Sequence, residues 1–408
     1  MPRHYLLILC IFALAALAAA QTPAGVNNLA SATPLVHGSL DGTRTAIFTT
    51  PRDACGPNDV PDAMARAFRD YKGTVHFSSA SSVLYQSLGS TLESVQHSCD
   101  AAFSSANDTN PADFNDQVWL DSFYTFDGKT IAALGHTEYH GWAIAGECHV
   151  KGNNQYGACE YDSDTYHQSK DGGYHFSTPK VPGNFLAGIP YKYEIDRGPA
   201  GYSVDTNIIE LSGWYYAVTT SWTWPPNCSG QTGPHHCITT GGAPIRTQNV
   251  FDPASWLGWN GSAFAVSFVD PYPGPVSHPG QHVFTPVQYM GFVNAINLYQ
   301  VSATQVVVAT LWDYWDNELG PPGMYLTTST DMVNWTKPTL VVKLKDLLAE
   351  DPPGNWLYAY FSLIDPSATD LNFSVLGNHP SLYYVRLNNN NSSERVLFRR
   401  PITLTPAD

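Results

Sequence analysis

A strand–turn–strand unit that recurs along the chain constrains the fold more than any other feature of the sequence. Short runs rich in Val, Ile, Tyr, Phe, Trp and Thr flank tight turns such as Lys72-Gly73, Asp127-Gly128 and Ser212-Gly213, a pattern typical of antiparallel strand pairs. The five units are RAFRDYKGTVHF, WLDSFYTFDGKTIAALGHTEY, NIIELSGWYYAVTTSWTW, NAINLYQVSATQVVVATLWDY and NHPSLYYVRLNNNNSSERVLFRRPI. Their spacing of roughly sixty to eighty residues predicts an all-β fold, a five-bladed β-propeller.

The segment LVHGSLDGTRTAIFTT precedes the first unit, and we expect it to pair with the C-terminal strands and close the ring. Helical periodicity is scarce, and LVVKLKDLLAEDP is the one fair candidate for a helix. The sequence therefore predicts a single β-propeller domain over residues 21–408.

The N-terminal segment MPRHYLLILCIFALAALAAAQ has a basic start and a short apolar run that ends in small residues. This pattern predicts a signal peptide over residues 1–20 and a secreted, extracellular protein. A membrane anchor is the alternative, but the run is short for a span and no later segment is apolar for long enough. We therefore expect no membrane insertion.

Six cysteines follow the predicted signal peptide, and an even number in a secreted chain indicates disulfides. We favour pairs of neighbours in sequence, namely Cys55–Cys99, Cys148–Cys159 and Cys228–Cys237. Zinc binding by these cysteines lacks the paired C-x-x-C spacing. Glycosylation sequons, which predict a glycoprotein, begin at Asn107, Asn227, Asn260, Asn334, Asn372, Asn390 and Asn391.

The charge balance of the chain bears on its partners. The formal net charge is −15, which disfavours nucleic acid and anionic membranes because both need clustered Lys and Arg. Charged residues and aromatic residues each make up 13% of the chain. A weakly charged surface rich in Tyr and Trp suits neutral polar ligands, so we expect a carbohydrate or polysaccharide partner.

Two segments resemble the turns of a known superfamily. SKDGGYHF, with Ser169, Asp171, Gly173 and Phe176, resembles the Asp box of sialidase-like propellers, and STDMVNW is similar to a copy without the glycine. The unit pattern also resembles the arabinanase, xylosidase and invertase-like glycoside hydrolases. Together with PDAMARAFRD and GHTEYHG, these segments are similar to a group of sialidase-like secreted proteins. The resemblance implies a propeller, and it implies Ca²⁺ as the common channel metal.

The stretch HTEYH places His136, Glu138 and His140 at alternate positions, so a strand would present all three on one face. A carboxylate between imidazoles is a candidate general acid, and we expect Glu138 to donate a proton while His136 and His140 orient it or bind hydroxyls. Two readings stay open beside catalysis. The same three residues could ligate Zn²⁺, although the spacing matches no established zinc motif, or form a structural polar cluster.

Asp62 stands just before the first unit, where the arabinanase-like hydrolases carry the base that activates water. The resemblance thus implies a catalytic role for Asp62, and a turn or capping role is the alternative. Arg66 follows four residues later and is a candidate to bind a carboxylate or sugar hydroxyls. A sialidase would need three arginines, and its F-R-I-P motif is absent from the sequence.

Further candidates for substrate binding lie on the later units. Asn207 alternates with Asp205, Asp313 lies between Trp312 and Trp315, and Tyr358 and Arg386 come from the last unit. For Asn207 with Asp205 the alternatives are turn or edge roles, and for Asp313 with its neighbouring tryptophans the alternative is packing. Tyr and Arg at a channel mouth are suited to holding a substrate carboxylate.

These residues favour a secreted glycoside hydrolase that uses an acid and a base carboxylate at the channel mouth. A polysaccharide lyase that uses His and Tyr, and a sugar-binding propeller without activity, remain the alternatives. The sequence contains no nucleotide-binding loop, no G-x-S-x-G elbow and no H-E-x-x-H helix.

Overall fold

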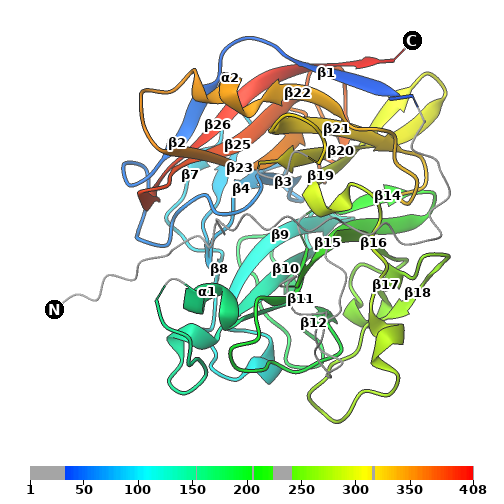
Figure 1. The fold of residues 1–408 in the computed structure, drawn as a ribbon. Coiled ribbons are helices and arrows are strands. Elements are labelled where there is room, and N and C mark those ends of the chain that lie inside the picture. Colours follow the sequence, from blue (N-terminus) through cyan, green and yellow to red (C-terminus); the bar gives the residue numbers. More distant parts are fainter. Residues whose placement is uncertain (1–32, 153, 205, 224–240, 315–317, 408) are drawn as a thin grey trace.

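The computed structural model describes residues 33–152, 154–204, 206–223, 241–314 and 318–407. Strands dominate this part of the chain, so the predicted all-β class is confirmed (Figure 1). The helices are short: α1 (Asn154–Ala158), α2 (Leu344–Leu348) and the 3₁₀ turns η1 (Pro111–Asp113), η2 (Gly141–Ala143), η5 (Pro253–Ser255), η6 (Pro279–His282) and η7 (Met290–Phe292). α2 lies inside the segment predicted to be helical. None of the helices in the described ranges is both long and apolar enough to cross a membrane.

The first half of the chain forms three sheets. The strands β3 (Arg66–Arg69), β4 (Val75–Ser78), β6 (Ser87–Gly89) and β7 (Gln96–His97) form one, and β5 (Val83–Leu84) pairs with β8 (Phe103–Ser104). A ten-stranded sheet follows, with β9 (Gln117–Thr125), β10 (Ile131–His140), β11 (Glu160–Ser169), β12 (Phe185–Ala187), β13 (Ala200–Val204), β14 (Ile209–Leu211), β15 (Trp214–Thr223), β16 (Gly241–Thr247), β17 (Leu257–Trp259) and β18 (Phe264–Ser267).

The second half forms two five-stranded sheets. One contains β19 (Val293–Val301), β20 (Thr304–Asp313), β21 (Gly323–Ser329), β22 (Thr339–Lys343) and β24 (Val375–Leu376). The other contains β1 (Val36–Leu40), β2 (Thr45–Thr49), β23 (Trp356–Ile364), β25 (Ser381–Asn388) and β26 (Asn391–Pro406). All five predicted strand–turn–strand units are confirmed, as the antiparallel pairs β3–β4, β9–β10, β14–β15, β19–β20 and β25–β26.

The turn between β9 and β10 shows why its sequence specifies a hairpin. Asp127 accepts backbone hydrogen bonds from Lys129 at 2.8 Å and Thr130 at 2.9 Å through Oδ1. Gly128 has a φ of +67°, and a Cβ there would lie 2.5 Å from the carbonyl carbon of Asp70. Only glycine meets both the conformation and the close approach at this position.

The two ends of the chain meet in one sheet. β1 and β2 both pair antiparallel with β26, as predicted from the sequence, so the N-terminal segment and the C-terminal strand lie side by side (Figure 1). Because this pairing joins residues 347 to 370 positions apart in the numbering, it holds the first and last parts of the fold together.

Hydrogen bonds from side chains to the backbone connect strands of different sheets. Arg66 on β3 donates to the carbonyl oxygen of Asp121 at 2.7 Å and to that of Asn294 at 3.0 Å. The amide oxygen of Asn294 on β19 accepts from the backbone N–H of Phe361 on β23 at 3.0 Å. β3, β9, β19 and β23 therefore meet around one central region.

The strand pairing does not by itself trace five separate blades. β11 and β13 pair in parallel over two residues, Tyr161↔Ala200 and Asp162↔Gly201, and this joins the second and third predicted units into one sheet. The number of blades and the closed ring therefore stay predictions.

Apolar side chains fill the space between neighbouring sheets. Phe68 of β3 packs with Val118 of β9 and Ile131 of β10, and all three are buried. Val218 of β15 packs in the same way with Ile296 of β19 and Val307 of β20. Complete burial of such a side chain contributes about 1.5–3 kcal/mol.

The predicted disulfides Cys55–Cys99 and Cys148–Cys159 are both formed. The third predicted pair, Cys228–Cys237, lies outside the described residues, and so does the predicted signal peptide.

The turn after β11 is organised by Ser169 and Asp171. The Ser169 hydroxyl donates to Asp171 at 2.7 Å and accepts from the backbone N–H of Gly173 at 2.9 Å, while Asp171 accepts from that of His175 at 3.0 Å. These bonds give the two residues a structural role in the turn. The relation to sialidase-like proteins stays a prediction.

Candidate functional site

His136, Glu138 and His140 lie at alternate positions of β10, and we call them the His–Glu–His row. His136 Nε2 lies 3.4 Å from Glu138 Oε1, and His140 Nε2 lies 2.8 Å from Glu138 Oε2. The three side chains thus share one face of the strand, as the alternation predicts. Their side chains are 13%, 26% and 17% exposed, so the row reaches solvent.

Asp121 on β9 continues this row by one residue. Its Oδ2 lies 2.7 Å from His136 Nδ1, which makes a chain of carboxylate, imidazole, carboxylate and imidazole. Burial lowers the pKa of His136, but the charge of Asp121 and the hydrogen bonds to Asp121 and Glu138 outweigh burial and raise the pKa well above its usual value. His136 is therefore an imidazolium at neutral pH, and Trp119 stacks on it at 5.5 Å.

The protonation of Glu138 follows from its two neighbours. Burial raises the pKa of Glu138, but hydrogen bonds from His136 and His140 outweigh it and lower the pKa to about 2. Glu138 is thus a carboxylate at neutral pH and holds no proton to donate in the resting protein. The predicted role as a general acid would require a proton from elsewhere.

Asp162 is a second carboxyl group near the row, and no sequence motif pointed to it. It lies on β11 directly opposite Glu138 in the antiparallel register, so the two side chains are on the same face. Asp162 is 3% exposed, and burial followed by repulsion from Glu160 and Glu138 raises its pKa well above the usual value. The signal in the sequence was EYDSDT, which alternates acidic residues so that Glu160, Asp162 and Asp164 face His140, Glu138 and His136.

Asp62 is buried in a contact between distant parts of the chain. Its Oδ1 forms an ion pair with Arg395 of β26 and accepts from the Tyr360 hydroxyl at 2.9 Å. Burial and the Asp62 charge raise the pKa of Tyr360 well above 10, and Glu138 contributes to the same shift. Tyr360 therefore lies within electrostatic reach of both Asp62 and Glu138.

Arg66 and Asn207 bind backbone groups of neighbouring strands. Arg66 is 5% exposed and donates to carbonyl oxygens of β9 and β19. Asn207 Oδ1 accepts from the backbone N–H of Ile296 at 3.1 Å. Both residues line a small cavity of about 10 Å³ together with Asn297 and Asn372. These contacts join strands, and the predicted contact of Arg66 and Asn207 with substrate stays a prediction.

Tyr358 and Arg386 face one another across β23 and β25, but their partners are elsewhere. Both contact Asp351, which also accepts from Arg44 at 2.6 Å, and the Arg386 guanidinium lies 4.2 Å from the centre of the Trp356 ring. Within the described ranges, neither residue contacts the His–Glu–His row.

Asp313 is fully buried at the end of β20 and accepts from the backbone N–H of Leu319 at 3.0 Å. Its neighbour Trp312 stacks on Phe361 at 4.3 Å, which matches the packing alternative for that residue. Trp315 and Asp205 lie outside the described residues. The predicted role of Asp313 in substrate binding stays a prediction.

Potential metal ligands converge at two places in the described part of the chain. These are Cys55, Asp59 and His97 in one group and Cys148, Cys159 and Asp196 in the other, with donor atoms within 4.8 Å of one another. Each group contains disulfide-bonded sulfurs, which are not thiolate ligands. In the His–Glu–His row, both carboxylate oxygens already face imidazole nitrogens. The expectations of Zn²⁺ and of Ca²⁺ both stay predictions.

No family model and no curated protein matches this chain. Solved structures that resemble it include an α-L-arabinofuranosidase from Lactobacillus brevis (10% identity, TM-score 0.45, 86% of this chain and 93% of that chain). An α-L-arabinanase mutant from Cellvibrio cellulosa gives 10% identity and a TM-score of 0.43 over 82% of this chain and 91% of that chain. A protein of unknown function from Dyadobacter fermentans gives 12% identity and a TM-score of 0.45 over 91% of this chain and 100% of that chain. Scores below 0.5 assign neither a family nor a reaction to this chain.

Proposed function

We propose that this chain is a secreted glycoside hydrolase built on a five-bladed β-propeller. The observation that carries the proposal is the pair Glu138 and Asp162, two carboxyl groups that face each other across β10 and β11 and have opposite pKa shifts. Hydrolysis of a glycosidic bond needs one carboxyl that holds a proton and one that is ionised. The strand pairing supplies both at the same place.

The protonation states suggest how the roles divide. Asp162, which is protonated, gives its proton to the leaving glycosidic oxygen as the bond to the anomeric carbon breaks. Glu138, which is ionised, stabilises the positive charge that develops at that carbon, or attacks it. A water molecule then adds, its oxygen to the anomeric carbon and one proton back to Asp162, which completes hydrolysis. Glu138, which the sequence predicted to be the general acid, is here the ionised carboxylate, and Asp162 takes the role of the acid.

The histidines set the charge and orientation of Glu138. His136 is held by Asp121 on one side and bonds Glu138 on the other, so it fixes the carboxylate and keeps it ionised. His140 bonds the second oxygen at 2.8 Å. Because its side chain is 17% exposed, His140 is also placed to contact a sugar hydroxyl.

Asp62 keeps its predicted role as a base in one version of the mechanism. Opposed residues on paired strands have Cβ atoms about 4.5–5.5 Å apart, so the carboxyl groups of Glu138 and Asp162 can reach the separation of about 5 Å that a retaining reaction needs. Attack by water activated by Asp62 would instead invert the anomeric carbon. The anomer released first therefore tells which carboxylate works with Asp162.

The class of substrate follows from the surface of the chain. Charged residues make up only 13% of the chain, and the half-buried ring of Trp142 lies against that of His140, whereas Trp119, which stacks on His136, is buried. Aromatic faces beside hydrogen-bonding groups suit the C–H faces and hydroxyls of a sugar. A carbohydrate is therefore the proposed substrate.

The test is digestion of a panel of polysaccharides by the purified protein, with Glu138→Gln and Asp162→Asn as matched variants. We expect cleavage of at least one neutral glycan and a loss of about 10²–10⁴-fold in kcat for each variant. Cleavage that both variants retain would contradict the assignment of the pair. No cleavage by folded protein would favour a sugar-binding role instead.

A lyase is the second candidate, because Tyr360 lies within electrostatic reach of Glu138. The raised pKa of Tyr360 keeps its hydroxyl protonated, so Tyr360 would serve as an acid and a histidine would have to serve as the base. Products with a new C=C bond that absorb in the near ultraviolet would identify this reaction.

A further inference from the structure

The loop between β10 and β11 begins and ends beside the proposed catalytic pair. It leaves β10 after His140 and enters β11 at Glu160, two residues before Asp162. The disulfide Cys148–Cys159 closes most of it. The loop therefore starts and ends within two residues of Glu138 and Asp162.

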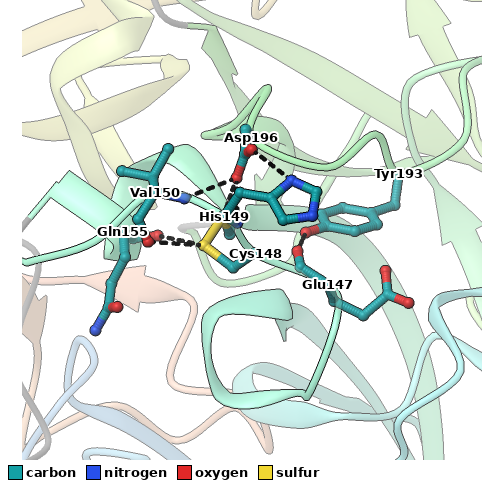
Figure 2. The surroundings of a disulfide bond; sticks show 8 residues. Glu147, Cys148, His149, Val150, Gln155, Tyr193 and Asp196 are labelled. Atoms are coloured by element: carbon teal, nitrogen blue, oxygen red, sulfur yellow. Dashed lines mark hydrogen bonds and ion pairs between the residues drawn. A yellow bond between two sulfur atoms is a disulfide. The ribbon is translucent and has the colours of Figure 1, made fainter.

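The loop is fastened to a neighbouring segment as well as to itself. Asp196 accepts from the backbone N–H of His149 at 2.7 Å and of Val150 at 3.1 Å, and its second oxygen lies 3.0 Å from His149 Nδ1 (Figure 2). The Tyr193 hydroxyl donates to the carbonyl oxygen of Glu147 (Figure 2). The backbone hydrogen bonds lower the pKa of Asp196, so it stays ionised and keeps these contacts.

Aromatic rings extend from the His–Glu–His row onto this loop. The ring of Trp142 lies 4.6 Å from that of His140 at an interplanar angle of 31°, and Tyr156 meets Trp142 edge-on at 4.8 Å. Both rings are half-buried. Within the described residues, the buried Nε1–H of Trp142 has no acceptor, so its side chain is not fixed by a hydrogen bond.

The surroundings of these rings are acidic. Residues 138–162 and 189–200 carry, besides the protonated Asp162, five acidic side chains against three basic ones, namely Glu138, Glu147, Glu160, Glu194 and Asp196 against Lys151, Lys192 and Arg197. Arg197 lies 3.5 Å from Glu194, which offsets its charge. An anionic sugar would be repelled here, whereas a neutral one would not.

We propose that Trp142 and Tyr156 form a stacking subsite for a neutral sugar residue next to the one that is cleaved. The subsite rests on the proposed function for its place along the substrate, but not for its ability to bind. A sugar stacked on Trp142 lies one ring beyond His140, so the site takes an oligosaccharide rather than a single sugar. The disulfide and Asp196 fasten the part of the loop that carries Tyr156.

The experiment measures binding without turnover. Glu138→Gln protein is titrated with neutral hexasaccharides of xylose, arabinose, mannose and glucose, and with hexagalacturonate, by isothermal calorimetry. We expect at least one neutral hexasaccharide to bind, and Trp142→Ala in this background to weaken its binding by about 10-fold or more, which corresponds to about 1.4 kcal/mol. Trp142→Phe should restore most of the affinity.

Phe126→Ala is the matched control. Phe126 is an aromatic residue that is 53% exposed in the turn at the other end of β9 and β10. Its loss should leave binding unchanged, and thermal unfolding verifies that each variant is folded. Asp196→Ala should weaken binding as Trp142→Ala does, because it releases the loop.

The outcomes separate this proposal from the hydrolase. Tighter binding of hexagalacturonate than of every neutral sugar, no binding of any probe, or equal affinity in Trp142→Ala and its parent would each overturn the subsite. Loss of binding in Trp142→Ala while the unaltered protein cleaves no glycan would keep the subsite and overturn the hydrolase.

Discussion

Glu138 and Asp162 are partners in the register of β10 and β11, and their carboxyl groups have opposite proton affinities. Two imidazoles hydrogen-bond Glu138 and lower its pKa to about 2. Burial and the neighbouring acidic groups raise the pKa of Asp162. One strand pair thus holds two carboxyls whose pKa values are shifted in opposite directions, a combination that suits the acid and base roles in cleavage of a glycosidic bond.

We predict that Asp162→Asn makes the protein more stable at neutral pH. A carboxyl with a raised pKa in the folded state stabilises the fold most at low pH, and that contribution is lost as pH rises above the unfolded value of 3.8. The amide carries no such cost. The difference in free energy of unfolding between Asp162→Asn and the unaltered protein should therefore grow from pH 4 to pH 7, by at most about 1.4 kcal/mol per pH unit. Urea unfolding at several pH values measures it, and a gain that is constant with pH would contradict the assignment.

The pH profile of activity should have two limbs with different origins. Activity falls with rising pH as Asp162 loses its proton, and falls toward pH 2 as Glu138 gains one. His136→Gln removes a hydrogen bond to Glu138, so the pKa of Glu138 should move up toward 4.5 and carry the acid limb with it. Rates measured from pH 2 to pH 9 test this. An acid limb at the same pH in the variant would show that Glu138 does not set it.

The buried ion pair of Asp62 with Arg395 should matter far more to stability than an ion pair at the surface. Arg395→Gln leaves the buried Asp62 charge without its partner, and such a loss costs about 3–5 kcal/mol of unfolding free energy. The control is Arg400→Gln, because its partner Glu350 is 34% exposed and pairs of this kind contribute about 0–1 kcal/mol. Equal losses in the two variants would argue against a buried charge pair.

The two disulfides should contribute unequally. In the chain-entropy description the stabilisation grows with the length of the closed loop, and the cysteines of Cys55–Cys99 and Cys148–Cys159 are 44 and 11 residues apart. This gives about 4 and about 3 kcal/mol. Unfolding of the two double-serine variants compares them. A larger loss for the short loop would indicate that its packing, rather than chain entropy, dominates.

Alternation along a strand could be predicted from the sequence, but contacts between strands could not. HTEYH has a period of two, which is enough to place His136, Glu138 and His140 on one face. The position of Asp162 opposite Glu138 could be predicted only from the register of β10 against β11. That register depends on a connecting loop of nearly twenty residues whose course the sequence does not specify. The alternate acidic residues of EYDSDT were the available signal.

For Tyr358 and Arg386 the strand pattern was predicted, but the partners of the side chains were not. Facing positions on β23 and β25 do bring them together, yet Asp351 contacts both side chains, and Tyr358 also accepts from Arg44, which is 314 positions away in the sequence. Asp62 likewise meets Arg395 through the pairing of the chain ends. The local pattern predicted the strands, whereas the partners of each charge depended on how the sheets assemble.

The most direct measurement is mass spectrometry of glycan products formed in water labelled with heavy oxygen, for the unaltered protein, Glu138→Gln and Asp162→Asn. We predict that the unaltered protein places labelled oxygen at the new reducing end of a neutral oligosaccharide, and that both variants lose this product. Unlabelled products that carry a double bond, or labelled products at an undiminished rate in both variants, would contradict hydrolysis by the Glu138–Asp162 pair.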